Sequence, residues 1–396
     1  MEKSRRRCVV HLVTALVKRG FHGVVVFIST HKPNHWWSAV AVMLSMHPFP
    51  FNRNALCSKL LCKKHLQRRQ IIMNINQIFE LSMVLDTEHF QRLFTTKASY
   101  LKELDDEYLD TSLAEKGITI IYRDSQYKKK VRLLVNVGMV LDDTSNTDKL
   151  IRKLNKRIVG YFDHKYRLDD FTLSGVNLVL DINVGSRANA SNYLKVLQRV
   201  GKVKGFSPVA YEGFDKKASF CQSGNSNDTD FLLYDLERAI AGQLQSADAG
   251  RKQLQSASKR TKGILRAEVR LTKPKAIRAY THTIDVSGQI VEIMKNSTDA
   301  FMGTFARTVP FGDFYKMDTA VEIVRSEVTD STMRRKMLRL LALIPEKKSL
   351  RLAQKAMNCR DVDKVMDTFA KINLSPVTIS KRHDVKHLDN LYSYLI

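Results

Sequence analysis

The sequence predicts an α+β fold in which an antiparallel sheet carries helices on one face and is followed by a C-terminal helical region. Between residues 117 and 272, runs of β-branched and apolar residues alternate with amphipathic segments, in the order two strands, helix, strand, helix and further strands. Beyond about residue 285 the apolar residues step by three and four, which is the helical period. This order is typical of an antiparallel sheet with segregated helices.

The first half of this region contains a predicted hairpin and two predicted helices. The runs 117–122 and 131–137 have strand composition and are separated by a polar turn at 123–126. Apolar residues at helical spacing predict a helix over 147–162, with Ser145 or Thr147 as its N-cap. The next expected elements are a buried strand at 176–182 and a helix at about 189–200, after which come Gly201 and Gly205.

The second half begins with strands and ends with helices. Strands are expected at about 207–211, 217–222, 229–235 and 264–272, with a Gln/Ser/Ala/Lys-rich linker, helical or mobile, at 241–262. Met337, Leu340, Leu341 and Ile344 predict a helix that Pro345 stops. Further helical segments are expected near 349–357 and 361–372, and a last amphipathic stretch contains Leu388, Leu391 and Leu395.

The net charge of +25 favours a polyanionic partner, either nucleic acid or an acidic membrane surface. The charge is concentrated at the ends of the chain. Residues 1–72 carry a net +12 and residues 331–396 a net +8, which leaves only +5 for the residues between them. We therefore expect affinity for polyanions to lie largely at the ends and catalytic chemistry to lie in the nearly neutral middle.

Cysteine spacing indicates neither a disulfide framework nor a zinc site, because the five cysteines include no CxxC pair. A reducing, cytoplasmic location is therefore expected. Lys3 and Arg5–Arg7 imitate the basic start of a signal peptide. However, Lys18 and Arg19 interrupt the apolar run that follows them well before it reaches a membrane-spanning length.

Residues 1–72 differ in composition from the rest of the chain. They contain both tryptophans, three of the five cysteines and six of the eleven histidines, and Glu2 is their only acidic residue. This bias ends at Met73. Our hypothesis is a basic extension at 1–72 that is not part of the native protein, a central domain at 73–284 where the chemistry is expected, and a helical, basic region at 285–396 that is expected to bind DNA. The alternative for 1–72 is a genuine basic N-terminal arm.

Two strands of the middle region carry residues with chemical potential. Tyr234 lies near the end of the apolar run Asp230–Leu236. Further along the chain, Glu268 lies between Arg266 and Arg270 at two-residue spacing, so these three side chains share one face of their strand. A tyrosine beside a carboxylate and two arginines is what attack on a phosphodiester would need.

The order of these motifs resembles the rolling-circle replication initiation proteins of plasmids and mobile elements in Gram-positive bacteria, known as the replication initiation factor family. The chain is similar, more distantly, to the replication proteins of filamentous phage. The residues that carry the resemblance are Gly117–Thr119, Leu173–Asp181, Tyr234–Asp235, Leu265–Glu268 and Ser375–Ser380. The resemblance extends over most of 73–396 and over none of 1–72.

The resemblance implies a replication-initiator nickase-like fold and a metal-dependent endonuclease that nicks and rejoins one DNA strand, with Tyr234 as nucleophile. Two positions depart from the family pattern. The first acid of an Asp-x-x-x-Asp pattern is Asn177, with Asp181 as the second, and the lysine expected after the tyrosine is Leu236. One departure removes a ligand charge and the other removes a cation near the scissile phosphate.

Elementary chemistry adds a requirement. A free tyrosine has a pKa of about 10, so its oxygen attacks phosphorus at neutral pH where a base or a metal ion favours the phenolate. A hard cation such as Mg²⁺ or Mn²⁺ would polarise the phosphoryl oxygen. We expect Asp181 and Glu268 as its ligands, with Asn177 on the same strand face as Asp181. Arg266 and Arg270 either clamp phosphate oxygens or form ion pairs with Glu268.

Each candidate also has a simpler structural interpretation. A strand tyrosine is more often a core aromatic than a nucleophile, strand carboxylates usually pair with Lys or Arg, and Tyr193 is expected to pack inside its helix. The His-x-His metal motif is absent, because Ile284 follows His282–Thr283. Gly185–Arg187 matches neither a P-loop nor a dinucleotide fingerprint, which argues against an ATPase.

The expected function is therefore a tyrosine endonuclease and strand transferase that starts rolling-circle DNA replication at an origin. Its expected partners are the origin DNA and the host replication helicase and polymerase, with no membrane; a homodimer is also compatible. Two other interpretations stay open. Asn177 and Leu236 favour a catalytically inactive DNA-binding regulator of a mobile element, and the charge alone favours a non-enzymatic RNA-binding protein.

The extension hypothesis predicts that residues 73–396, expressed without residues 1–72, fold on their own. The expected result is a circular dichroism spectrum of a folded α+β protein and a cooperative thermal transition. A fragment that is unfolded in this measurement would reject the hypothesis and support a genuine N-terminal arm.

Overall fold

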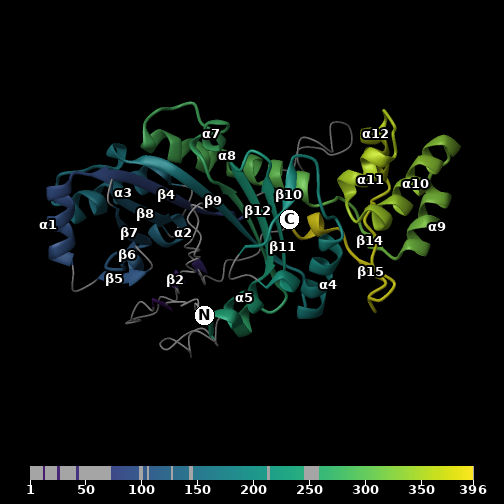
Figure 1. Cartoon of the computed structure of the whole chain (residues 1–396), viewed down its shortest axis with the longest axis horizontal. Helices are drawn as coiled ribbons and strands as arrows, with labels where there is room; N and C mark the ends of the chain where they lie inside the picture. The colour runs from purple at the N-terminus through teal and green to yellow at the C-terminus, as the bar shows by residue number, and fades with distance from the viewer. Residues whose placement is uncertain are drawn as a thin grey trace, which may run out of the picture.

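The computed structural model describes residues 73–97, 101–104, 107–125, 128–141, 146–211, 215–244 and 258–395, and three short paired strands, Leu12–Val13 (β1), Val25–Val26 (β2) and Val42–Met43 (β3). The predicted α+β class is confirmed, because a large antiparallel sheet is followed by a mainly helical C-terminal part (Figure 1). The rest of 1–72, the N-cap candidate Ser145 and residues 245–257 of the linker lie outside the described residues.

The main sheet has ten strands, and each strand is antiparallel to its neighbours. Their spatial order is β10 (Phe206–Pro208), β11 (Ser219–Gly224), β12 (Thr229–Asp235), β13 (Ile264–Leu271), β9 (Thr172–Asn183), β4 (Asn76–Leu85), β8 (Lys129–Asn136), β7 (Ile118–Asp124), β6 (Glu107–Asp110) and β5 (Leu101–Leu104). The predicted hairpin is β7–β8. The central strand β4 was not predicted.

In the chain, the helices lie between these strands and after them. In chain order they are α1 (Thr87–Lys97), α2 (Val137–Val140), α3 (Thr147–Tyr161), α4 (Arg187–Gln198), α5 (Leu236–Leu244), α7 (Pro274–Arg278), α8 (Val286–Thr308), α9 (Met317–Glu327), α10 (Ser331–Lys347), α11 (Leu350–Ala356) and α12 (Val362–Lys371). A small ladder of β14 (Phe314–Tyr315) and β15 (His387–Leu388) joins the C-terminal segments. Within the described part of the chain, no helix is both long and apolar enough to span a bilayer.

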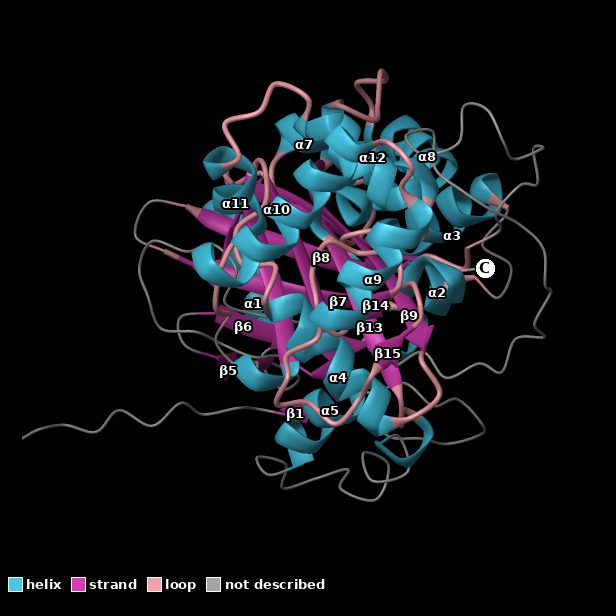
Figure 2. Cartoon of the chain, turned by 90° about the vertical axis from the view of Figure 1, so that its right-hand side faces the viewer, coloured by secondary structure: helices cyan, strands magenta, loops and turns pink. Residues whose placement is uncertain are grey.

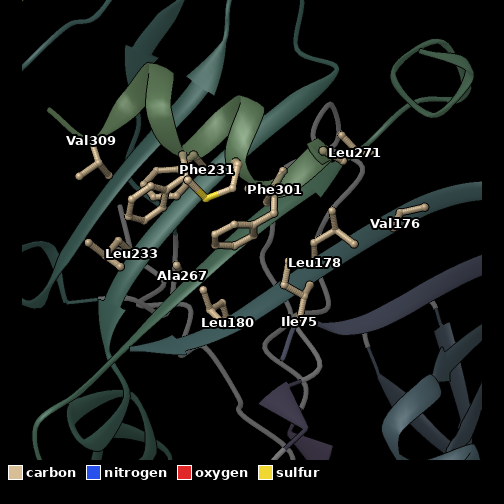
Figure 3. Packing of buried hydrophobic residues seen from close by; sticks show 14 of the residues in the cluster. Ile75, Val176, Leu178, Leu180, Phe231, Leu233, Ala267, Leu271, Phe301 and Val309 are labelled. Atoms are coloured by element: carbon tan, nitrogen blue, oxygen red, sulfur yellow. The ribbon is translucent and has the colours of Figure 1, made fainter. Parts of the chain in front are cut away.

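One face of the main sheet is apolar and forms the core. Alternate residues of β13, such as Ala267 and Val269, point to this face, and α8 lies across it (Figure 3). The rings of Phe231 on β12 and Phe305 on α8 meet edge to face, with centroids 5.8 Å apart. Helices α3, α7 and α8 group on one side of the strands in Figure 2. Successive side chains of a strand point to opposite faces of the sheet. The opposite face therefore carries the charged and polar residues of β13.

Two local predictions were wrong at the ends of their helices. Helix α3 is capped by Asn146, whose side chain accepts from the backbone N–H of Lys149 at 2.9 Å, rather than by Ser145 or Thr147. Pro345 does not stop α10, which continues to Lys347; the left-handed Lys348 follows. A proline removes one backbone donor. The helix nevertheless continues for two residues beyond it, and Ile344, the residue before the proline, is buried.

The last predicted amphipathic stretch is not an α-helix. Leu388 belongs to β15, and a 3₁₀ turn at Leu391–Tyr394 follows it. Asn390 caps this turn, because its side-chain oxygen accepts from the N–H of Tyr392 at 3.2 Å. Asparagine competes for backbone groups in this way and favours turns over helices.

Backbone contacts join the C-terminal helices to the loop after α4. The N–H of Leu350 donates to the carbonyl of Val200 at 2.8 Å, and that of Arg351 donates to the carbonyl of Lys202 at 2.9 Å. Gly201 lies between these contacts with φ +57°, and a Cβ there would lie 2.4 Å from the carbonyl oxygen of Lys348. The approach therefore requires glycine.

We expect Gly201→Ala to destabilise the protein by about 1–3 kcal/mol through its backbone conformation alone, with a further loss from the contact at Lys348. Gly160→Ala is the matched control, because Gly160 is an exposed residue of α3 with nothing near its Cβ position. That change should stabilise by up to about 1 kcal/mol. Chemical denaturation measures both, and equal effects would contradict the close approach.

Candidate active site

The predicted site residues meet on the polar face of three adjacent central strands. The ladder places Tyr234 of β12 opposite Arg266 of β13, and Arg266 opposite Asp181 of β9. Arg270 lies opposite Asn177 in the same way. We call these residues, together with the intervening Glu268, the Tyr234 cluster: Tyr234, Asp181, Asn177, Arg266, Glu268 and Arg270.

The tyrosine and the central carboxylate are in direct contact. The hydroxyl of Tyr234 donates to Oε1 of Glu268 at 2.6 Å, which is a short, charge-assisted hydrogen bond. Tyr234 is 1% exposed and Glu268 is 4% exposed, so the contact is buried. The expected proximity of a tyrosine and an acid on neighbouring strands is therefore present in the structure.

The second oxygen of Glu268 is held from two directions. Arg270 donates through Nε at 2.9 Å and through Nη2 at 2.6 Å to Oε2. The amide Nδ2 of Asn177 donates to the same oxygen at 3.0 Å. With Tyr234 on Oε1, the carboxylate accepts hydrogen bonds from all three strands.

Arg266 pairs with Asp181 rather than with Glu268. Its Nε lies 2.6 Å from Oδ1 and its Nη2 lies 2.8 Å from Oδ2, which is the bidentate geometry of a guanidinium and a carboxylate. The arginine is buried, but the side chain of Asp181 is 42% exposed. The sequence left open whether the arginines clamp phosphate or form ion pairs with Glu268. In this conformation both arginines form ion pairs, and Arg270 is the one that pairs with Glu268.

Burial and charge shift the pKa values of this cluster. Burial raises the pKa of the Tyr234 hydroxyl well above its usual value, and the Glu268 charge adds to the shift. Burial alone would also raise the pKa of Glu268, but Arg270, the Tyr234 hydroxyl and Arg266 outweigh it and hold that pKa below its usual value. Glu268 is thus ionised and Tyr234 is protonated at neutral pH.

The predicted metal ligands are occupied by cationic and amide groups. Asp181 binds Arg266, and Glu268 binds Arg270, Tyr234 and Asn177. Among the described residues no group of three His, Cys, Asp or Glu side chains is placed to hold a metal ion. Oδ1 of Asn177 is buried and has no hydrogen-bond partner in the part of the chain that the structure describes. Because a cation here would have to displace two guanidinium groups, these residues do not fit Mg²⁺ or Mn²⁺ in this arrangement.

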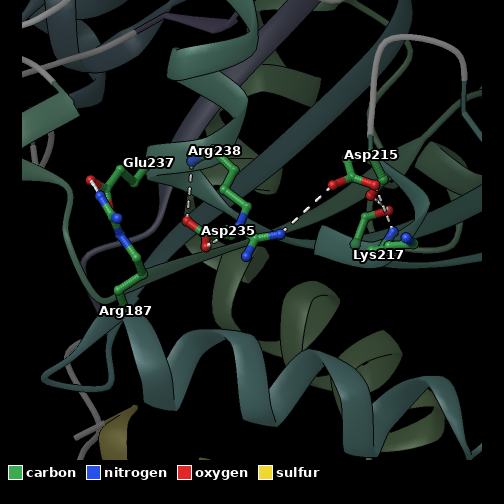
Figure 4. A network of polar contacts seen from close by, with 7 residues as sticks. Arg187, Asp215, Lys217, Asp235, Glu237 and Arg238 are labelled. Carbon is green, nitrogen blue, oxygen red and sulfur yellow. Dashed lines mark hydrogen bonds and ion pairs between the residues drawn. The ribbon is translucent and has the colours of Figure 1, made fainter.

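The residues after Tyr234 are structural. Leu236, at the expected lysine position, is 1% exposed and begins α5. Asp235 accepts from the N–H of Arg238 at 3.2 Å, and Arg187 of α4 pairs with Glu237 through Nε at 2.8 Å (Figure 4). These contacts fix the start of α5 against α4.

One aromatic residue near the cluster was not predicted. The guanidinium of Arg270 lies 5.9 Å from the ring centroid of Tyr211, which follows β10. Burial and then the charge of Asp230 raise the pKa of this tyrosine. The strand predicted at about 207–211 included Tyr211, but β10 ends at Pro208 and Tyr211 lies in the loop that follows it.

The predicted DNA-binding region contains a pair of short basic helices. Two residues, Lys348 and Ser349, separate α10 from α11. Arg335 and Arg339 are exposed one turn apart on α10. Two packed helices joined by a tight turn are compatible with a DNA-binding module of the helix-turn-helix type, and DNA binding stays a prediction.

We expect Arg270→Met to destabilise the protein by about 3–5 kcal/mol at pH 7, because it leaves the Glu268 charge buried without its strongest partner. Arg335→Met removes an exposed arginine of α10 and should change stability by less than about 0.5 kcal/mol. Chemical denaturation of both variants measures the difference, and equal losses would contradict this role of Arg270.

The same carboxylate predicts a pH dependence. The folded-state pKa of Glu268 is below its unfolded value, so its contribution is complete above the unfolded pKa of about 4.3 and is lost as the pH falls through the folded pKa. Glu268→Gln should therefore flatten the loss of stability in acid. An unchanged acid limb in the denaturation profile would contradict the assignment.

Comparisons with known proteins add no assignment. No protein-family model matches this chain, and no curated protein matches it at a significant level. The resemblance to replication initiators therefore stays an expectation, and a functional proposal has to stand on the geometry of the Tyr234 cluster.

Proposed function

We propose that this protein nicks and rejoins one strand of DNA, as in the initiation of rolling-circle replication, with Tyr234 as nucleophile and Glu268 as its base. The observation that carries the proposal is the 2.6 Å hydrogen bond from the Tyr234 hydroxyl to Oε1 of Glu268. A nucleophile in hydrogen-bond contact with a base that is itself oriented by a third group is the general arrangement for covalent catalysis. Arg270 and Asn177 are the orienting groups here.

The reaction would proceed by general-base catalysis. The Tyr234 oxygen attacks phosphorus while its proton moves to Glu268, the P–O3′ bond breaks, and the 3′ oxygen leaves and takes a proton from water. The 5′ phosphate stays on the tyrosine as a phosphodiester. Because proton transfer accompanies attack, the raised pKa of Tyr234 does not have to be overcome by forming a free phenolate first.

Two arginines take the place of the expected lysine. Arg266 is opposite Tyr234 in the ladder and Arg270 binds the same carboxylate as its hydroxyl. Both charges act on Tyr234, since each lowers its pKa against the effect of burial. In the proposal they stabilise the negative charge that develops on the phosphoryl oxygens.

The burial of Tyr234 supports a second candidate function. The hydroxyl of a tyrosine that is only 1% exposed cannot meet a phosphodiester unless the polar face of the sheet opens. If it stays closed, the Tyr234 cluster is a structural ion-pair network. The exposed arginines of α10 would then make the protein a DNA-binding regulator without cleavage.

A nicking assay separates the two functions. The full chain, incubated with supercoiled DNA that carries the origin of its own element and with Mg²⁺ or Mn²⁺, should convert the DNA to nicked circles with protein attached. Tyr234→Phe should abolish both the nick and the attachment and leave DNA binding intact, because the ring is kept. A parallel reaction with EDTA tests the predicted metal requirement.

Tyr193→Phe is the matched control. Tyr193 is also fully buried, but its hydroxyl donates to the carbonyl of Asp389 at 2.8 Å and belongs to the packing of α4. This variant should nick at the wild-type rate. If the wild-type protein binds DNA without cutting it, the regulator is the correct function, and a preference for RNA would favour the RNA-binding alternative.

A further inference from the structure

A second basic cluster lies where the C-terminal segment passes α4. Ile379 donates its N–H to the carbonyl of Tyr315 at 2.8 Å and forms a bridge with Lys316, which fixes the segment beside the start of α9. A turn follows, in which His383 donates its N–H to the carbonyl of Ser380 at 3.0 Å. The strand β15 follows this turn in the chain, and Figure 1 shows it next to α4.

Two elements contribute positive charge around His383. Lys195 lies in the last turn of α4, Arg199 is the C-cap residue of the same helix, and Lys316 precedes α9. Burial lowers the pKa of His383, and Lys195, Arg199 and Lys316 lower it further, whereas Asp384 raises it. The imidazole therefore has three cationic neighbours and one acidic neighbour, and is neutral at pH 7.

Two buried nitrogen atoms of this cluster have no hydrogen-bond partner among the described residues. They are Nε of Arg199 and Nδ1 of His383. Buried polar atoms are usually paired, so each exception calls for an explanation. The contrast with Arg266 and Arg270 is direct, because both of those guanidinium groups bind a carboxylate. Burial without such a partner lowers the pKa of Arg199.

We propose that Lys195, Arg199, Lys316 and His383 bind a phosphate group. The guanidinium of Arg199 and an imidazole that can take up a proton, together with two lysines, supply both the directed hydrogen bonds and the charge that a phosphate needs. A carboxylate ligand would have fewer oxygens for these four groups. The site does not depend on Tyr234 or on the proposed nicking, and either free phosphate or the phosphodiester backbone of a polynucleotide supplies the ligand chemistry.

The test follows the His383 ring by NMR in the full chain during titration with inorganic phosphate. Phosphate should shift the ring resonances and raise the pKa of His383, because a neighbouring anion favours the imidazolium form. Arg199→Ala should weaken binding about tenfold or more through loss of a charge-assisted contact. Resonances of His383 that do not respond to phosphate would overturn the proposal.

Two further variants control for folding and for general charge. Lys195→Ala changes an exposed residue of the cluster and should weaken binding even if Arg199→Ala fails to fold. Arg152→Ala removes an exposed arginine from the distant α3 and should leave the affinity unchanged. Equal weakening by Lys195→Ala and Arg152→Ala would overturn the site in favour of general electrostatic attraction.

A short single-stranded oligonucleotide in place of inorganic phosphate identifies the source of the ligand. A response of His383 at a lower concentration of phosphate groups than with the inorganic ion supports the site and assigns it to a polynucleotide backbone. A response to the inorganic ion alone also supports the site and assigns it to free phosphate. Absence of a response to both would overturn it.

Discussion

The buried carboxylate of Glu268 is the group on which the centre of the sheet depends. A negative charge taken out of water is costly unless it is paired and hydrogen-bonded. Here Tyr234 satisfies one oxygen, and Asn177 and Arg270 satisfy the other. Since these donors belong to β12, β9 and β13, the charge links three strands through side chains as well as through the backbone ladder. A slip of one residue in any ladder would turn its donor to the apolar face.

The two ion pairs of the cluster differ in their access to water, and therefore in how easily each pair separates. Glu268 and Arg270 are both nearly inaccessible, with side chains 5% exposed, whereas Asp181 is 42% exposed beside its buried Arg266. A pair with one partly solvated member is the weaker of the two, because water already stabilises the aspartate once the pair separates. Arg266 is therefore the guanidinium that can exchange its partner at the lower cost.

Much of this arrangement follows from period-two alternation. Leu265, Ala267 and Val269 alternate with Arg266, Glu268 and Arg270, so the sequence alone predicts one apolar face and one charged face for β13. The strand β4 escaped prediction because Asn76, Gln77, Glu80 and Ser82 dilute its apolar pattern, although Phe79 and Leu81 are fully buried. The choice of Asp181 as partner for Arg266 also escaped, because ladder register depends on the whole sheet and not on either strand.

The same geometry indicates how the residues of this ion-pair network could also serve the proposed reaction. Attack by Tyr234 needs a phosphate near its oxygen, and the cation opposite that tyrosine in the ladder is Arg266. A phosphate that displaces Asp181 would give Arg266 an equivalent bidentate anion, while Glu268 would keep Arg270 and stay ionised to receive the proton. The ion pair of Arg266 and Asp181 would then be the one that exchanges its anion, and the buried pair of Arg270 and Glu268 would stay in place. In the proposed reaction, the buried hydrogen bonds of Glu268 would hold its carboxylate against the Tyr234 hydroxyl, in the position that a base needs.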